Sequence, residues 1–183
     1  MLSLVQDDDS TALIVGLADF ALGLFYDAEP PFGYVGQGKV ELVVARELAR
    51  CTRIALREAR EAGFRAAAMW AVHFPPDFPN VDDRLRLLDS EILLRAAADC
   101  RVQAVIAGHT HQQLTYEAPV ISRDGEGAIG IPVHCSGATT GLGPDANFFF
   151  SVLDVDVRGD DAAQLRVAHH RYDSAAGVFA LVP

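Results

Sequence analysis

The spacing of hydrophobic and polar residues divides the chain into a first half with strands and helices and a second half with strands only. Short apolar runs typical of buried strands occur at Thr11–Ala18, Ala66–Val72 and Val102–Ala107. Two segments between these runs have a period near 3.6 residues instead. The order through residue 107 is therefore strand, helix, strand, helix, strand, which is typical of an α/β protein.

The two helical segments are predicted from apolar residues that recur at three- and four-residue steps. The first helix is expected over Val40–Ala62 and should end at Gly63, since glycine favours the turn that closes a helix. Its apolar stripe is Val40, Val43, Val44, Leu48, Cys51, Ala55 and Ala59. The second helix is expected from about Asp83 to Ala98, with Asp82 as a possible N-cap. Its inner face would be Leu85, Leu88, Ile92 and Leu93.

The second half contains five further strand patterns separated by turns rich in Gly, Asp and Pro. They are Gln112–Tyr116, Ile129–Cys135, Phe148–Val157, Leu165–Tyr172 and Val178–Val182. We expect this half to form a β meander, and we expect residues 1–183 to form a single domain. The predicted fold class is mixed α/β (α+β), with sheets packed face to face and helices outside.

Charge and composition narrow the function classes. The formal net charge of −10 disfavours binding to the phosphates of nucleic acids and favours attraction of divalent cations. No apolar stretch reaches the about 18 residues that a membrane helix needs, and the start of the chain has no signal-peptide pattern. The three cysteines have no CxxC spacing and are read as reduced, mostly buried thiols. We therefore expect a soluble cytoplasmic protein without a membrane or nucleic-acid partner.

Three of the histidines stand where an apolar run ends. His73 directly follows one run, and His109 and His111 follow the next run, after Gly108. In open α/β sheets ligands bind at the carboxyl ends of the strands, so both runs should deliver imidazoles to one edge. Residues i and i+2 of an extended segment face the same side. Gly108 would let the backbone approach a ligand closely.

A purely structural role for these histidines is the alternative to metal binding. A single histidine at a strand end is more often structural than a ligand, and an isolated His-x-His is common by chance. The combination is more informative, because two apolar runs each end in imidazole and His109 follows His73 by 109 − 73 = 36 residues. Neutral imidazole suits Zn, Fe, Mn or Ni. The pattern therefore favours a metal site formed by His73, His109 and His111.

The same residues resemble a known family. His73-Phe74-Pro75-Pro76 followed by Gly108-His109-Thr110-His111 is similar to the calcineurin-like metallophosphoesterases, over roughly residues 11–157. The resemblance implies an αββα sandwich and two divalent metal ions (Mn, Fe or Zn) about 3.5–4 Å apart. It implies that His73 and His109 bind one metal and that His111 binds the other. It also implies hydrolysis of a small-molecule phosphoester, with the motif order closest to the phosphodiesterase branch.

The earlier motifs of that family are not found in this sequence. They are Asp-x-His, Gly-Asp-x-x-Asp and Gly-Asn-His-Asp/Glu, and they supply the remaining metal ligands. We therefore expect the sandwich to be N-terminally incomplete and the chain to be the C-terminal portion of the domain. Two other residues could support the site. Asp19 ends the first strand, although it is more typical of a turn, and His134 is expected in the core or next to the ligands.

Two further hypotheses remain open. The chain could be a non-catalytic binding or scaffold protein with the same fold, which the missing motifs favour. It could also be a hydrolase in which His73, His109 and His111 hold a single Zn, as in three-histidine sites. The adjacent pair His169-His170 lies in a predicted strand, so its side chains should face opposite sides and are interpreted as exposed or structural.

Overall fold

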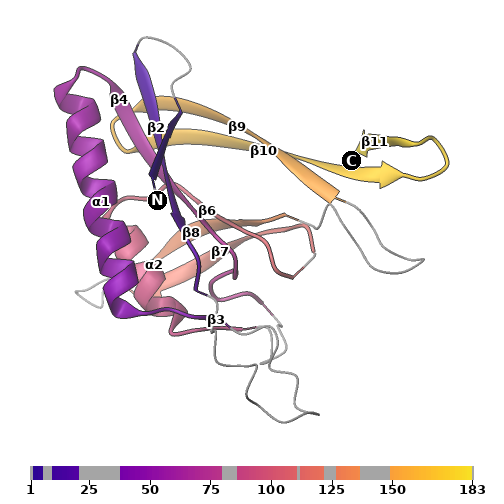
Figure 1. Ribbon diagram of the computed structural model, residues 1–183, viewed down its shortest axis with the longest axis horizontal. Coiled ribbons are helices and arrows are strands. Elements are labelled where there is room, and N and C mark those ends of the chain that lie inside the picture. The colour runs from indigo at the N-terminus through magenta and orange to yellow at the C-terminus, as the bar shows by residue number, and fades with distance from the viewer. Residues whose placement is uncertain are drawn as a thin grey trace.

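A mixed sheet forms the centre of the molecule. The computed structural model describes residues 2–5, 10–20, 38–79, 86–110, 112–121, 127–136 and 149–182. Within these residues a six-stranded sheet has the order β1-β2-β4-β6-β8-β7 (Figure 1). Its strands are β1 (Leu2–Val5), β2 (Thr11–Ala18), β4 (Arg65–Val72), β6 (Val105–Ala107), β7 (Leu114–Ile121) and β8 (Ala128–Cys135). The four inner strands are parallel, whereas β1 and β7 are antiparallel to their neighbours.

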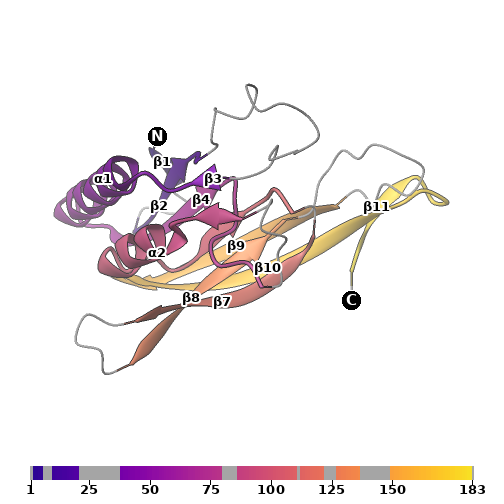
Figure 2. The same ribbon diagram turned by 90° about the horizontal axis from the view of Figure 1, so that it is seen from below.

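The described helices cover one face of this sheet. Both α1 (Leu42–Glu61) and α2 (Ser90–Asp99) lie on that face, and a three-stranded sheet lies on the opposite face (Figure 2). The smaller sheet contains β9 (Phe149–Gly159), β10 (Ala162–Asp173) and β11 (Val178–Leu181). The chain is therefore mixed α/β, and its described residues form three layers: helices, sheet and sheet.

Each predicted strand has a counterpart, but β6 begins at Val105 rather than Val102, and β7 continues to Ile121 rather than ending at Tyr116. The short strand β1 was not predicted. Only β9, β10 and β11 form an antiparallel meander. The hairpin of β7 and β8 extends the central sheet instead, because β8 pairs in parallel with β6. Local sequence patterns show that these strands exist but do not show to which sheet each one belongs, since that depends on partners distant in sequence.

The first helix matches its predicted range, but its buried face matches the predicted stripe only in part. The buried residues of the helix are Ala45, Leu48, Ala49, Thr52 and Leu56, of which only Leu48 was predicted. The predicted Ala55 and Ala59 are partly buried against the core. Val43 and Val44 are exposed instead. Thr52 is fully buried, and its hydroxyl accepts a hydrogen bond of 3.0 Å from the Trp70 indole of β4. A polar residue was not expected on the inner face.

The helix α1 ends as predicted, at Gly63. The N–H of Gly63 donates to the carbonyl of Arg60, and the N–H of Phe64 donates to the carbonyl of Ala59. These two bonds form a Schellman motif, which requires a left-handed residue after the helix. Gly63 supplies it, with φ of 91°.

The prediction that the second helix begins near Asp83 is wrong. The helix α2 begins at Ser90, and Leu87–Leu88 form the short strand β5. This strand pairs in parallel with β3 (Gly38–Lys39). That partner lies far away in the sequence, so periodicity could not reveal it. The inner face is Leu93, Leu94 and Ala97; Leu85 and Asp82 lie outside the described residues.

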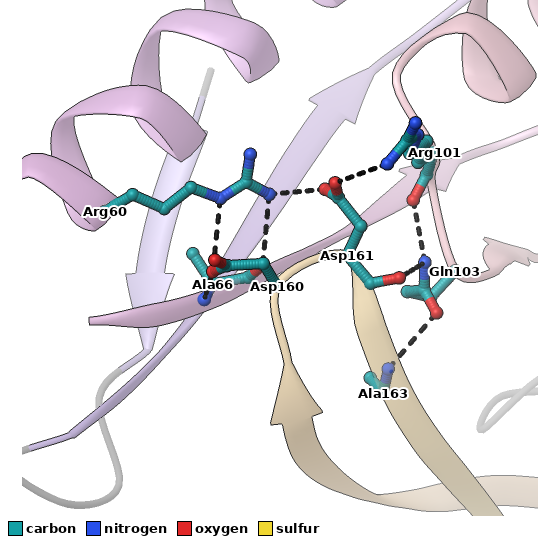
Figure 3. A network of polar contacts seen from close by, with 7 residues as sticks. All are labelled: Arg60, Ala66, Arg101, Gln103, Asp160, Asp161 and Ala163. Carbon is teal, nitrogen blue, oxygen red and sulfur yellow. Dashed lines mark hydrogen bonds and ion pairs between the residues drawn. The ribbon is translucent and has the colours of Figure 1, made fainter. Parts of the chain in front are cut away.

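The β9–β10 hairpin is fixed to the central sheet at its turn (Figure 3). Asp161 accepts hydrogen bonds from Arg60 of α1 and, at 3.3 Å, from Arg101. The side chain of Gln103 joins the same turn, because it donates to the carbonyl of Asp161 at 2.8 Å and accepts from the N–H of Ala163 at 3.1 Å. These bonds connect the two sheets and α1 at the end of β4 opposite to its carboxyl end.

Two expectations from composition bear on this structure. All three cysteines are free thiols, and Cys100 and Cys135 are buried, as predicted. In the part of the chain that the structure describes, neither helix is long and apolar enough to cross a membrane.

Candidate metal site

Four parallel strands end side by side, and this row defines the candidate site. Ala18, Val72, Ala107 and Cys135 are the last residues of β2, β4, β6 and β8, and each is paired in register with the next. The residues that follow are therefore delivered to one edge of the sheet. They are Asp19, His73, Gly108-His109 and Ser136. This is the carboxyl edge at which ligands collect in open α/β sheets.

The imidazoles of His73 and His109 face one another at this edge. Nδ1 of His109 lies 3.1 Å from Nε2 of His73, so one nitrogen donates a hydrogen bond and the other accepts it. The centroids of the two rings are 5.0 Å apart. The backbone supports the arrangement, because the N–H of Gly108 donates to the carbonyl of His73 at 3.1 Å. The predicted convergence of these two histidines is confirmed.

In the turn after β6, the residue with an unusual backbone conformation is His109 and not Gly108. His109 has φ of 64°, a left-handed conformation that residues with a Cβ adopt at a cost. A Cβ added to Gly108 would meet only the carbonyl oxygen of His73, at an ordinary 3.8 Å. The left-handed residue therefore turns the His109 ring toward His73. Such conformations cluster at functional sites, which makes the turn informative.

The spacing of the two nitrogens fits a shared metal ion. Two nitrogens that bind one zinc ion tetrahedrally at about 2.0–2.1 Å lie about 3.3 Å apart. The observed distance between Nδ1 of His109 and Nε2 of His73 is 3.1 Å. These two side chains could therefore become ligands of one cation with small adjustments. His111, the third predicted ligand, lies outside the described residues.

Asp19 lies at the same edge as His73. It directly follows β2 and is exposed. A hollow of about 400 Å³ is lined by Leu17, Ala18, Asp19, Ala71, Val72 and His73. Asp19 thus borders the space beside one histidine of the pair, and its predicted supporting role in the site stays a prediction.

His134 is the second-last residue of β8, so it lies one residue before the strand ends that form the site. It pairs in register with Ile106 of β6, and its Nδ1 is hydrogen-bonded to the hydroxyl of Thr115 at 2.9 Å. Burial lowers the pKa of His134, and the nearby His169 lowers it further. Burial therefore favours the neutral ring, and the hydroxyl of Thr115 on the neighbouring strand orients it. This fits the expectation of a core or supporting residue.

The remaining histidines belong to the three-stranded sheet. Nδ1 of His169 lies 2.9 Å from the hydroxyl oxygen of Ser151, whereas the ring of His170 stacks on Phe150 with centroids 4.6 Å apart. Both contacts are with β9 of the same sheet, which agrees with the structural alternative of the prediction that this pair is exposed or structural.

Two aromatic residues near the site were not identified from the sequence. Phe74 is buried next to both histidine rings, and the hydroxyl of Tyr116 holds the segment after His73 through the carbonyl of Pro76. Phe74 is part of the His73–Pro76 motif, yet a single sequence gives no sign of which face its ring takes. The contact of Tyr116 with Pro76 spans 40 residues, so no local pattern reports it.

Comparison of the chain with models of known protein families gives no match, and comparison with curated proteins gives none either. The function proposed for this chain therefore rests on the geometry of the four strand ends and on the histidines that follow them.

Proposed function

We propose that this chain provides part of the active site of a metal-dependent phosphoester hydrolase of the calcineurin-like type. The observation that carries the proposal is the 3.1 Å approach of Nδ1 of His109 to Nε2 of His73 at the carboxyl edge of a parallel sheet. The layered arrangement of helices, sheet and sheet would then be part of an αββα sandwich.

In this proposal the histidines act as ligands and not as bases. His73 and His109 would hold one divalent cation, and His111 would hold a second one. A divalent cation acts in such sites as a Lewis acid that offsets phosphoryl charge and makes water more acidic. Asp19 and the backbone of Gly108 border the same edge, where a small phosphoester could approach. Mn, Fe and Zn all accept imidazole, so each is a candidate.

A single-zinc site is the second candidate. It uses the same facing nitrogens of His73 and His109, and it needs none of the ligands that the family motifs missing from this sequence would supply. With His111 as the third ligand, the zinc ion would have three histidine ligands, as in known zinc hydrolases. Metal analysis separates the two candidates, because one zinc per chain supports the single site and two metals per chain support the pair.

The experiment is hydrolysis of a generic aryl phosphodiester with added Mn²⁺ or Zn²⁺. It uses the purified chain and, in parallel, the chain extended by any coding sequence that continues upstream of Met1. His73→Ala and His109→Ala should each lower metal-dependent turnover by more than the roughly 10–100-fold caused by loss of an outer partner of a metal ligand.

The matched control is His170→Ala, which removes an imidazole that stacks on Phe150 in the other sheet. Its turnover should equal that of the wild-type chain. Absence of metal-dependent turnover in both forms of the wild-type protein would defeat the hydrolase proposal. The protein would then be better described as a binding or scaffold module.

A further inference from the structure

A buried phenylalanine connects the histidine pair to the protein core. The ring centroid of Phe74 lies 4.8 Å from that of His73 and 4.2 Å from that of His109. The side chain is only 4% exposed and belongs to the main core cluster. The three rings thus form one group, in which Phe74 is the member anchored in the interior.

Gly38 of β3 provides the space for this ring. A Cβ added to Gly38 would lie 2.6 Å from Cδ2 of Phe74 and 2.9 Å from the carbonyl oxygen of Phe20. Both separations are shorter than a carbon atom tolerates, so any larger residue would displace the ring or the backbone. Gly38 is fixed in place, because β3 pairs with β5 and the N–H of Lys39 donates to the carbonyl of Phe20 at 2.8 Å.

We propose that Phe74 is a positioning residue that holds the imidazoles of His73 and His109 in their facing arrangement, and that Gly38 keeps the room for its ring. The consequence for metal binding rests on the proposed function. His73 is exposed, so its ring needs a neighbour to restrict its rotamers. His109 has a left-handed backbone that directs its ring onto Phe74. A preorganised pair loses less conformational entropy when it binds a cation.

The first test uses the metal-free protein, so it is independent of the proposed function. In wild-type protein, nuclear Overhauser effects should connect the ring protons of His73 and His109 and those of His109 and Phe74. Phe74→Leu keeps apolar volume in the core but removes the ring, and it should abolish the effects between the two histidines. Gly38→Ala should weaken them. Unchanged effects between the histidines in Phe74→Leu would overturn the positioning role.

The second test measures the affinity for Zn²⁺ by calorimetry at constant pH. Phe74→Leu should weaken binding by roughly 10–100-fold, as is usual when a residue that orients a ligand is lost. Phe78→Leu is the matched control, since this ring lies in the same segment but packs edge-on against Tyr116. It should bind zinc as the wild type does. Equal losses in both variants would show general loosening of the segment and would also overturn the proposal.

A double variant tests whether Gly38 acts through the ring. If it does, Gly38→Ala should weaken zinc binding in the wild-type background and have little further effect in the Phe74→Leu background. Equal effects in both backgrounds would refute the part of the proposal that concerns Gly38. Wild-type protein that binds no zinc while its histidine rings remain in contact would defeat the proposed function and leave the positioning role intact.

Discussion

The hydroxyl of Tyr116 donates a hydrogen bond of 2.6 Å to the carbonyl oxygen of Pro76 and so ties β7 to the segment that follows His73. Burial raises the pKa of this phenol, so it remains a donor at all ordinary pH values. Tyr116→Phe should lower the free energy of unfolding by about 1–3 kcal/mol, because the Pro76 carbonyl loses its partner. Urea denaturation measures this. A variant as stable as the wild type would show that water replaces the hydroxyl.

The buried hydroxyl of Thr52 makes a second testable contact. It accepts from the Trp70 indole at 3.0 Å and donates to the carbonyl of Leu48 at 2.8 Å. Thr52→Val keeps the shape but leaves the indole N–H buried without an acceptor, which should cost about 1–3 kcal/mol. Thr52→Ser keeps the hydroxyl and should cost less. Trp70 is the single tryptophan of the chain, so its fluorescence reports unfolding directly. Equal stability of the two variants would contradict the role of this bond.

The ion pairs of Asp161 should hold the three-stranded sheet on the central sheet. Its carboxylate bonds Arg60 and Arg101 and is 15% exposed. Asp161→Ala should destabilise the protein by about 1.5–3 kcal/mol, since hydrogen bonds to charged groups are lost. Asp154→Ala removes an exposed pair with Arg166 and should cost less than about 1 kcal/mol. Thermal unfolding compares the two variants, and equal losses would argue against a specific role for the turn.

His134 should make the stability depend on pH. Burial lowers its pKa in the folded state, and His169 adds to this effect. The unfolded chain therefore binds a proton more readily, so the free energy of unfolding should fall as the pH drops below about 6.5. His134→Gln should reduce this slope in urea titrations between pH 7.5 and 5.5. An identical slope in the variant would assign the dependence to other groups.

The apolar runs in the sequence were sufficient to predict where the strands that form the site end. Val72 and Ala107 end apolar runs and prove to be register partners, which brings His73 beside His109. The resemblance to metallophosphoesterases stays a hypothesis that the geometry supports only through this pair. His111 lies outside the described residues, so its part in the site stays a prediction.

The features that could not be predicted depend on contacts between distant residues. The strand β5 replaced a predicted helical turn because Leu87 pairs with Gly38, far away in the sequence. Thr52 lies on the inner face of α1, where no polar residue was predicted, because its hydroxyl accepts a hydrogen bond from the distant Trp70. The Phe74 ring was overlooked for the same reason, since its room is created by Gly38.

The most direct test of the central claim is an anomalous-scattering map from crystals of the chain soaked in Zn²⁺. We predict a zinc peak at about 2.0–2.1 Å from both Nε2 of His73 and Nδ1 of His109. The peak should disappear in His73→Ala. A map without zinc at these two nitrogens, or with zinc bound elsewhere while the two rings stay hydrogen-bonded to each other, would contradict a metal site at this edge.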